Sequence, residues 1–394
     1  MIYKDFLGKK VSTLGMGVMR LPTTEDGKIN DTEAAKLVDH AYKNGVNYFD
    51  TGYFYHSGDS ERFIGEALRK YPRDSWFLAN KIPGNTMRKV DGKIELSGIG
   101  DTPWMINGPA DLFEYQIDKC GVDYFDFYLL HNLSENSYDI YTDEELGIVD
   151  YLIKQKEAGR IKHIGFSTHG RTETIEAYLK HLESKGQLKH IEFAMVQINY
   201  LDMSLQDADK KYELLTKYGL PVLAMEPTRG GKLCNLGGMA GDILKAARPD
   251  FSQAAWCFRF LQSMENMQIV ISGMSNMEQL EENLALFSEK IELTTADFDA
   301  IERAVEALAD FVPCTDCKYC IDACPQGLNI PLLMTLYNEA NYEVAWMLRA
   351  SLRGLGDKTP EACVMCGLCS PLCPQNIDIP QVLKKFDELV GASS

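Results

Sequence analysis

Eight cysteines near the C-terminus have the spacing of iron–sulfur ligands. They form two runs of the same pattern, C-x2-C-x2-C-x3-C-P, which begin at Cys314 and Cys363. In such a run the first three thiolates converge on one cubane, and the fourth cysteine is a ligand of the other cluster. We therefore predict two 4Fe–4S clusters, the first held by Cys314, Cys317, Cys320 and Cys373, and the second by Cys363, Cys366, Cys369 and Cys324.

The alternatives for these cysteines are structural zinc and disulfides. Zinc sites usually have C-x2-C pairs separated by a longer loop rather than four cysteines in a row. A disulfide scaffold does not fit, because only three of the eleven cysteines, Cys120, Cys234 and Cys257, lie in the first 313 residues. The apolar segment 330–355 between the runs predicts two helices, so the module resembles the α-helical ferredoxins and predicts electron transfer.

Upstream of the cysteines, strand-like apolar runs alternate with amphipathic helical stretches. Several of these runs are continuously apolar, which is typical of strands covered on both faces. Eight strand–helix units predict a (β/α)8 TIM barrel, in which the chemistry is at the C-terminal ends of the strands. The eight runs span 11–19, 46–51, 76–82, 125–131, 163–168, 193–200, 220–226 and 268–274. Six of them end in polar residues, namely Asp50, Lys81, His131, Ser167, Gln197 and Glu226.

The elements between and after the strands divide the chain. Segment 31–45 predicts a helix with Asp31 or Thr32 as its N-cap. The Gly-rich segment 83–109 follows a strand end and predicts an irregular lid, binding loop or interface. We expect a barrel over 1–290, a linking helix over 291–310 and a mostly α-helical two-cluster domain over 311–394.

Four segments of the barrel resemble the aldo/keto reductase family: 46–68, 125–131, 161–169 and 271–283. Members of that family use an Asp, Tyr, Lys and His tetrad, which the resemblance assigns to Asp50, Tyr55, Lys81 and His131. The chemistry agrees, because a tyrosine with a pKa of about 10 is a useful acid only if its phenolate is stabilised. The Lys81 ammonium, held by Asp50, would stabilise it. His131 would orient the substrate oxygen or relay the proton.

The resemblance also implies a nicotinamide site. In the family a Ser-Asn pair and a Gln hold the carboxamide, and an aromatic residue stacks on the ring. Ser167 and Gln197 match, whereas Thr168 stands in place of the Asn and Met225 in place of the aromatic residue. For the phosphates and adenine we expect Arg229, Gly273, Ser275, Gln279, Glu282 and Asn283. Gly273 and Gln279 provide no positive charge for the 2′-phosphate of NADPH.

The barrel residues and the cysteine runs together predict an oxidoreductase in which one-electron and two-electron carriers must exchange electrons. Clusters pass single electrons and a nicotinamide transfers a hydride, so a flavin (FMN) near Met225 is an alternative to NAD(P)H in the barrel pocket. The predicted function is interconversion of a carbonyl and an alcohol, or reduction of an enone, with electrons passed to or from the clusters. The alternative is a catalytically silent barrel that serves as an electron-transfer or regulatory subunit of a larger redox complex.

Composition limits the partners. The 394 residues carry a formal net charge of −17, which disfavours binding to nucleic acid. No run approaches eighteen apolar residues, and the N-terminus lacks the apolar core of a signal peptide, so we expect a cytoplasmic protein without a membrane partner. The expected partners are a small carbonyl or alcohol substrate and a redox protein.

Overall fold

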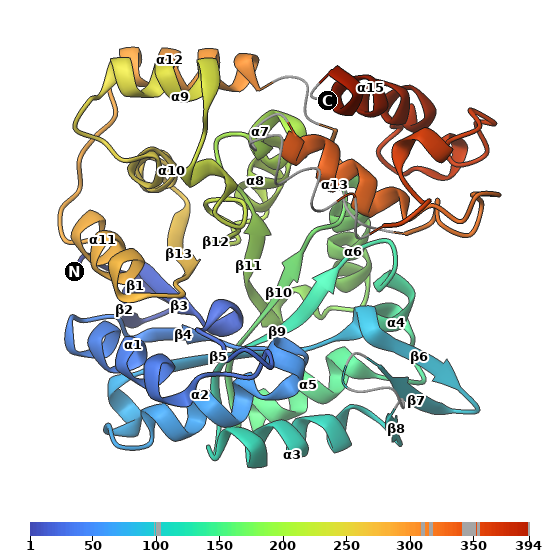
Figure 1. Ribbon diagram of the computed structural model, residues 1–394. Coiled ribbons are helices and arrows are strands. Elements are labelled where there is room, and N and C mark those ends of the chain that lie inside the picture. Colours follow the sequence, from blue (N-terminus) through green and yellow to red (C-terminus); the bar gives the residue numbers. More distant parts are fainter. Residues whose placement is uncertain are drawn as a thin grey trace. The chain divides into compact units, whose positions relative to one another are not determined.

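The computed structural model describes residues 1–97, 99, 104–308, 312–314, 318–340, 352 and 355–392 (Figure 1). The chain forms two compact units, one of residues 1–233 with 254–294, and the other of residues 234–253 with 295–394. Among the described residues, no helix has the length and apolar character needed to cross a membrane.

A closed barrel of eight parallel strands is the centre of the first unit (Figure 1). All eight predicted strands are confirmed, and neighbouring strands pair in parallel around the ring. In chain order they are β3 (Leu14–Gly17), β4 (Tyr48–Asp50), β5 (Phe77–Ile82), β9 (Phe125–Leu133), β10 (Ile161–Thr168), β11 (Ile191–Gln197), β12 (Val222–Met225) and β13 (Met267–Gly273).

The first predicted strand, 11–19, is divided in the structure. Its beginning belongs to an antiparallel hairpin of β1 (Tyr3–Phe6) and β2 (Lys9–Ser12), and only β3 enters the barrel. The hairpin places Phe6 inside the ring of strands, where it stacks on Phe127 with the ring centroids 5.3 Å apart. Both residues belong to one buried apolar cluster with the early residues of several strands, so the hairpin closes the N-terminal end of the barrel.

Amphipathic helices surround the strands because each has one buried apolar face. α1 (Asp31–Lys43) has Asn30 as its N-cap, whose side chain accepts a hydrogen bond from Glu33 N, so the predicted cap was wrong by at least one residue. The other helices of this unit are α2 (Ser60–Leu68), α3 (Pro109–Cys120), α4 (Tyr138–Thr142), α5 (Ile148–Glu157), α6 (Thr172–Ser184), α7 (Asp202–Leu205), α8 (Ala208–Lys217), α10 (Gln253–Gln262) and α11 (Met277–Leu286).

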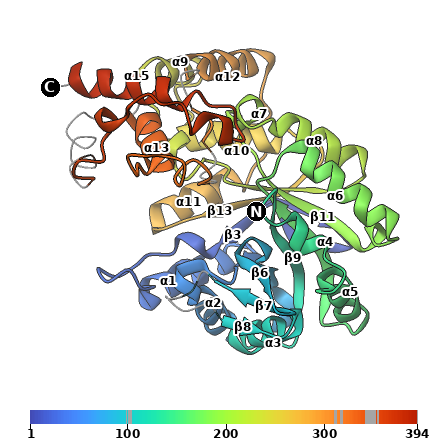
Figure 2. The ribbon, with the colours of Figure 1, turned by 90° about the vertical axis from the view of Figure 1, so that its right-hand side faces the viewer.

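The segment predicted as an irregular loop, 83–109, instead forms an antiparallel sheet of three strands. They are β6 (Met87–Val90), β7 (Lys93–Leu96) and β8 (Trp104–Ile106), and Figure 2 shows them beside α3. Asp91 and Gly92 connect β6 to β7, both with positive φ, 48° and 73°. An Asp-Gly pair suits a tight hairpin turn, so this prediction missed a signal that the sequence contains.

Within the residues that the structure describes, the second unit contains two pairs of helices. α9 (Gly238–Ala247) packs on α12 (Thr295–Ala307), where Arg248 makes a bidentate ion pair with Asp297 at 3.0 and 2.9 Å. In the cysteine-rich part, α13 (Ile330–Ala340) packs on α15 (Ile379–Ala392) around a buried core that includes Met334 and Phe386. Residues 295–307 of the segment expected as a linking helix form α12, which belongs to the second unit. The second helix predicted within 330–355 falls mostly outside the described residues.

Candidate active site and cluster sites

The barrel brings the four predicted tetrad residues together. Asp50 is the last residue of β4, Lys81 lies in the neighbouring β5, and His131 lies in β9, which pairs with β5. Lys81 Nζ is 2.5 Å from Asp50 Oδ1 and donates to the Thr51 carbonyl at 2.6 Å. Its Nζ also lies over the Tyr55 ring, 4.9 Å from the ring centroid.

Tyr55 reaches this point from the loop after β4, at the start of η2 (Tyr55–Gly58). Its ring lies against Gly52, where an added Cβ would be 3.2 Å from the ring, so a larger residue at 52 would displace the tyrosine. The next residues, His56 and Ser57, have positive φ of 51° and 54°. His56 Nε2 accepts a hydrogen bond from Leu21 N at 3.2 Å, which holds the turn to the loop after β3.

The charges in the site follow from burial and the ion pair. Burial raises the pKa of Tyr55, and the Lys81 charge opposes that rise. Burial alone would lower the pKa of Lys81, but the interactions with Asp50 and with Tyr55 together raise it. Burial, and then the Lys81 charge, lower the pKa of His131 well below its usual range. The site therefore holds a protonated lysine, a protonated tyrosine and a neutral histidine.

Aromatic contacts and one hydroxyl hold His131 in place. Its ring stacks on Phe54 with centroids 4.9 Å apart and planes 8° apart, and it meets the Tyr55 ring nearly at right angles, 83°, at 5.8 Å. The Tyr141 hydroxyl lies 2.8 Å from the His131 carbonyl oxygen. Within the described part of the chain, His131 Nδ1 is buried and has no hydrogen-bond partner.

A second polar group lies where β10 and β11 end. Ser167 Oγ accepts from Asn132 N at 2.9 Å, whereas the Thr168 hydroxyl donates to the Leu133 carbonyl at 2.7 Å. Gln197 Oε1 is 2.9 Å from Nδ1 of His169, and its Nε2 donates to Asp202 at 2.9 Å. Thr168 is thus committed to the backbone.

Sequence reasoning missed three members of this group. Asp202 also accepts from the Asn199 side chain at 2.7 Å and forms an ion pair with the predicted Arg229 at 3.1 Å. No sequence pattern marks Asp202 or Asn199. His169 directly follows the Ser-Thr pair of the motif, so its position could have indicated it.

The residues predicted for phosphate and adenine lie at β13 and α11, except for Arg229, which is paired with Asp202. Ser275 N donates to Gln279 Oε1 at 2.8 Å at the start of α11, close to Gly273. Asn283 is turned inward, and its side chain donates to Ser272 Oγ at 3.0 Å. The aliphatic carbons of Arg20, which sequence reasoning missed, lie 3.1 Å from the position of a Cβ on Gly273, and its guanidinium is 3.7 Å from the Glu226 carboxylate. Glu282 is half-buried on α11, and Met225 is half-buried at the end of β12.

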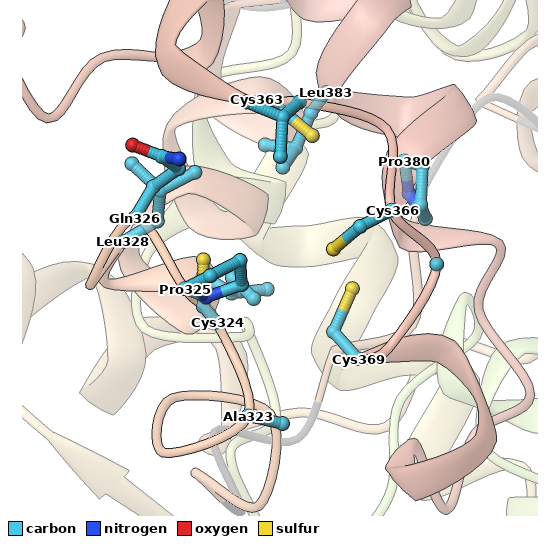
Figure 3. A pocket seen from close by; sticks show the side chains of 13 residues that line it. Ala323, Cys324, Pro325, Gln326, Leu328, Cys363, Cys366, Cys369, Pro380 and Leu383 are labelled. Carbon is cyan, nitrogen blue, oxygen red and sulfur yellow. The ribbon is translucent and has the colours of Figure 1, made fainter.

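The two predicted cluster sites are separate cavities in the cysteine-rich part. One is lined by Cys324, Cys363, Cys366 and Cys369, the whole set expected for the second cluster. Figure 3 shows their sulfur atoms pointing toward the space between the segment of Cys324 and the segment of the other three. The other cavity is lined by Cys314, Cys320 and Cys373, and Cys317 lies outside the described residues. Convergent thiols around a cavity are the donor set that a cubane needs.

Comparison with known proteins agrees with this architecture. The aldo/keto reductase family model matches residues 13–306. The chain belongs to the aldo/keto reductase family. A second match, to a 4Fe-4S dicluster domain, covers residues 313–377.

Three related proteins show the range of the similarity. L-galactose dehydrogenase of Arabidopsis thaliana is 25% identical over 325 residues, which are 76% of this chain and 93% of the relative. The probable aldo-keto reductase 1 of Glycine max is 27% identical over 160 residues, and only 42% of its length is matched by 41% of this chain. An aldo-keto reductase crystal structure from Klebsiella pneumoniae, in complex with NADPH, superposes with a TM-score of 0.58 at 18% identity, over 77% of this chain and 95% of that one.

The family membership makes this aldo/keto reductase an oxidoreductase with an iron–sulfur domain. The match to the dicluster domain supports iron–sulfur clusters in this chain. A nicotinamide and a flavin in the barrel pocket both stay predictions. The roles of individual residues follow as proposals.

Proposed function

We propose that the barrel interconverts a small carbonyl compound and its alcohol, with Tyr55 as the proton donor. The observation that carries this proposal is the buried chain of contacts from Asp50 through Lys81 to Tyr55, beside a neutral His131. A silent barrel would have no need for a buried lysine paired with an aspartate and placed over a tyrosine ring.

Each residue has a distinct part in the proposed reaction. In the reducing direction, the Tyr55 hydroxyl donates its proton to the carbonyl oxygen as the carbon accepts hydride. The phenolate that remains is stabilised by the Lys81 ammonium, which Asp50 keeps protonated. His131 is held at right angles to the Tyr55 ring, so a neutral imidazole would orient the carbonyl oxygen toward the hydroxyl. The alcohol forms when one hydride and one proton have been added.

The cofactor residues would be those gathered at the ends of β10 to β13. Ser167 and the group around Gln197 would hold the carboxamide, and the start of α11 with Arg20 would hold the phosphates. A bound nicotinamide supplies the hydride, which is two electrons at once. The thiol sets around the two cavities would hold the clusters, each of which supplies or accepts one electron.

A matched pair of tyrosine variants tests the proposal. Tyr55→Phe removes the proposed acid and should lower turnover of an activated aromatic aldehyde with NADH by about 10²–10⁴-fold. Tyr53→Phe removes a hydroxyl from the same loop and should leave turnover nearly unchanged. The assay follows NADH oxidation in anaerobically purified protein that carries both clusters. Near-normal turnover by Tyr55→Phe would refute Tyr55 as the acid.

A further inference from the structure

Three consecutive residues directly after Tyr55 have a left-handed backbone. His56, Ser57 and Gly58 have φ of 51°, 54° and 86°. Glycine adopts this region freely, whereas a residue with a Cβ is strained there, and left-handed residues normally occur singly. The turn that carries the proposed acid is therefore unfavourable by itself, so contacts with the surrounding structure must hold it.

The side chain of His56 makes such a contact. Its Nε2 accepts a hydrogen bond from the backbone N–H of Leu21 at 3.2 Å. Within the turn, Asp59 N donates to the His56 carbonyl at 3.1 Å, and Tyr55 N donates to the Gly52 carbonyl at 3.1 Å. His56 thus joins the strained turn, and the tyrosine next to it, to the loop after β3.

Leu21 is a rigid anchor for this bond. It is buried and directly follows η1 (Val18–Arg20), whose carbonyl groups are held from two sides. Ser60 Oγ donates to the Val18 carbonyl at 3.3 Å, and Ser275 Oγ donates to the Arg20 carbonyl at 2.8 Å. Because the anchor is fixed, the bond to His56 restrains the position of the turn.

The bond exists only while His56 is neutral. A backbone N–H can only donate, so Nε2 must carry a lone pair and the imidazole proton must be on Nδ1. An imidazolium has an N–H on both nitrogens, so Nε2 would turn an N–H toward the N–H of Leu21. Protonation of His56 therefore breaks the contact with the anchor.

The surroundings of His56 favour the neutral imidazole. η1 and α2 pack against η2, and Lys119 of α3 approaches Gly58. The charged residues on η1 and α2, and at the end of η2, are Arg20, Asp59, Glu61, Arg62 and Glu66. Burial lowers the pKa of His56 from its ordinary value of 6.5, and the Asp59 carboxylate opposes that shift. Asp59 is itself bound by Arg62, at 2.7 and 2.8 Å.

We propose that His56 is a positioning residue that holds the Tyr55 turn in its active geometry while the imidazole is neutral, and that acid releases this turn. His56 reaches Leu21 rather than the reacting atoms, so it acts through Tyr55. This inference rests on the proposed function, because it requires that Tyr55 be the proton donor.

The test compares two variants of His56 in the anaerobic, cluster-loaded protein. Oε1 of a glutamine lies as many bonds from Cα as Nε2 of a histidine, so His56→Gln keeps an acceptor that does not take up a proton near neutral pH. His56→Leu has a side chain of similar bulk and no acceptor. The assay measures kcat and KM for an activated aromatic aldehyde with NADH from about pH 5.5 to about pH 8, the range in which histidines titrate.

The expected profiles differ between the variants. In the wild type, kcat should fall as pH drops below about 6.5, toward the kcat of His56→Leu. At neutral pH the kcat of His56→Leu should be about 10–10²-fold below wild type with KM nearly unchanged, because a displaced acid slows the chemical step. His56→Gln should recover most of the wild-type kcat and lose the fall at acid pH. The control is His40→Gln on α1, which should keep the wild-type profile.

The outcomes separate the two proposals. Wild-type kcat in His56→Leu overturns the positioning role, and a fall at acid pH that persists in His56→Gln overturns the release by acid. Calorimetry shows whether each variant is folded at the assay temperature; if His56→Leu is not, the profile of His56→Gln decides. Tyr55→Phe is run beside them. If it retains turnover, the proposed function fails, whereas if it loses turnover and His56→Leu does not, only the inference fails.

Discussion

Replacing Lys81 by methionine removes the charge between Asp50 and Tyr55 while keeping an unbranched side chain. The ion pair is deeply buried, since the side chains of Lys81 and Asp50 are only 1% and 5% exposed. Removing one partner of such a pair leaves the other charge buried without compensation, which costs about 3–5 kcal/mol of the free energy of unfolding. For a domain of this size that corresponds to a fall in Tm of about 6–20 °C.

The loss has a predictable pH dependence. Burial raises the pKa of Asp50 even in the presence of Lys81, whose charge opposes the rise. Without the lysine, the pKa of Asp50 should therefore rise further. A carboxyl whose pKa is higher in the folded state holds its proton better there than in the unfolded chain. The free energy of unfolding of Lys81→Met should therefore fall as pH rises above about 4, the carboxyl's unfolded pKa.

A double variant separates stability from catalysis. Asp50→Leu/Lys81→Met replaces the pair with apolar side chains and should recover most of the lost stability, because buried ion pairs are often no more stabilising than apolar packing. Aldehyde turnover should stay about 10²–10⁴-fold below wild type in both variants, since neither stabilises the Tyr55 phenolate. Calorimetry gives Tm and NADH oxidation gives turnover. Recovery of turnover together with stability in the double variant would contradict the electrostatic role of Lys81.

Three further predictions concern the clusters, a histidine and a helix cap. Cys366→Ser should lower the iron content from about eight to about four per chain by elemental analysis, whereas Cys234→Ser, outside both runs, should leave it at about eight; equal iron in both would contradict the assigned ligands. The lowered pKa of His131 means that the unfolded chain binds a proton that the folded protein does not, so stability should fall as pH drops below about 6.5. His131→Asn should flatten that dependence in urea titrations between pH 7 and 5, and an unchanged slope would exclude His131 as its source. Asn30→Ala should cost about 1 kcal/mol in the same titrations, and no loss would mean that the cap on α1 is dispensable.

The grouping of the predicted cluster cysteines, and of Asp50, Lys81 and His131, could be expected from local spacing and from the geometry of a barrel. Two runs of identical spacing indicate a cluster each, and the cavities in the structure gather the same sets, with Cys317 outside the described residues. Parallel strands end at one edge of a barrel, so Asp50, Lys81 and His131 were expected to meet there. The prediction for segment 83–109 was wrong, because the turn-forming pair Asp91-Gly92 was not recognised. This pair connects two strands of a hairpin in a segment that was expected to be irregular.

Hydrogen-bond direction could not be predicted, because it depends on residues far apart in the chain. The family positions for carboxamide binding correspond to Ser167, Thr168 and Gln197 in the sequence. Only their hydrogen-bond partners in the structure show which donors and acceptors of each side chain can still bind a ligand. Thr168 is bound by a carbonyl thirty-five residues earlier. Asn283, expected at the adenine, is committed to Ser272 on the neighbouring strand.

By itself, then, the sequence determined the order of the strands and the spacing of the eight thiols, because strand periodicity and ligand spacing are properties of short segments. The resemblance to the aldo/keto reductases assigned the four tetrad positions. Only the tertiary structure decided which polar side chains are hydrogen-bonded within the protein and which remain able to bind a ligand. Asp202 orients Gln197, Gln197 orients His169, and each link joins residues that only the closed barrel brings within hydrogen-bond distance. Hydrogen-bond capacity is finite for every side chain, so a residue's chemistry depends on the neighbours that folding provides.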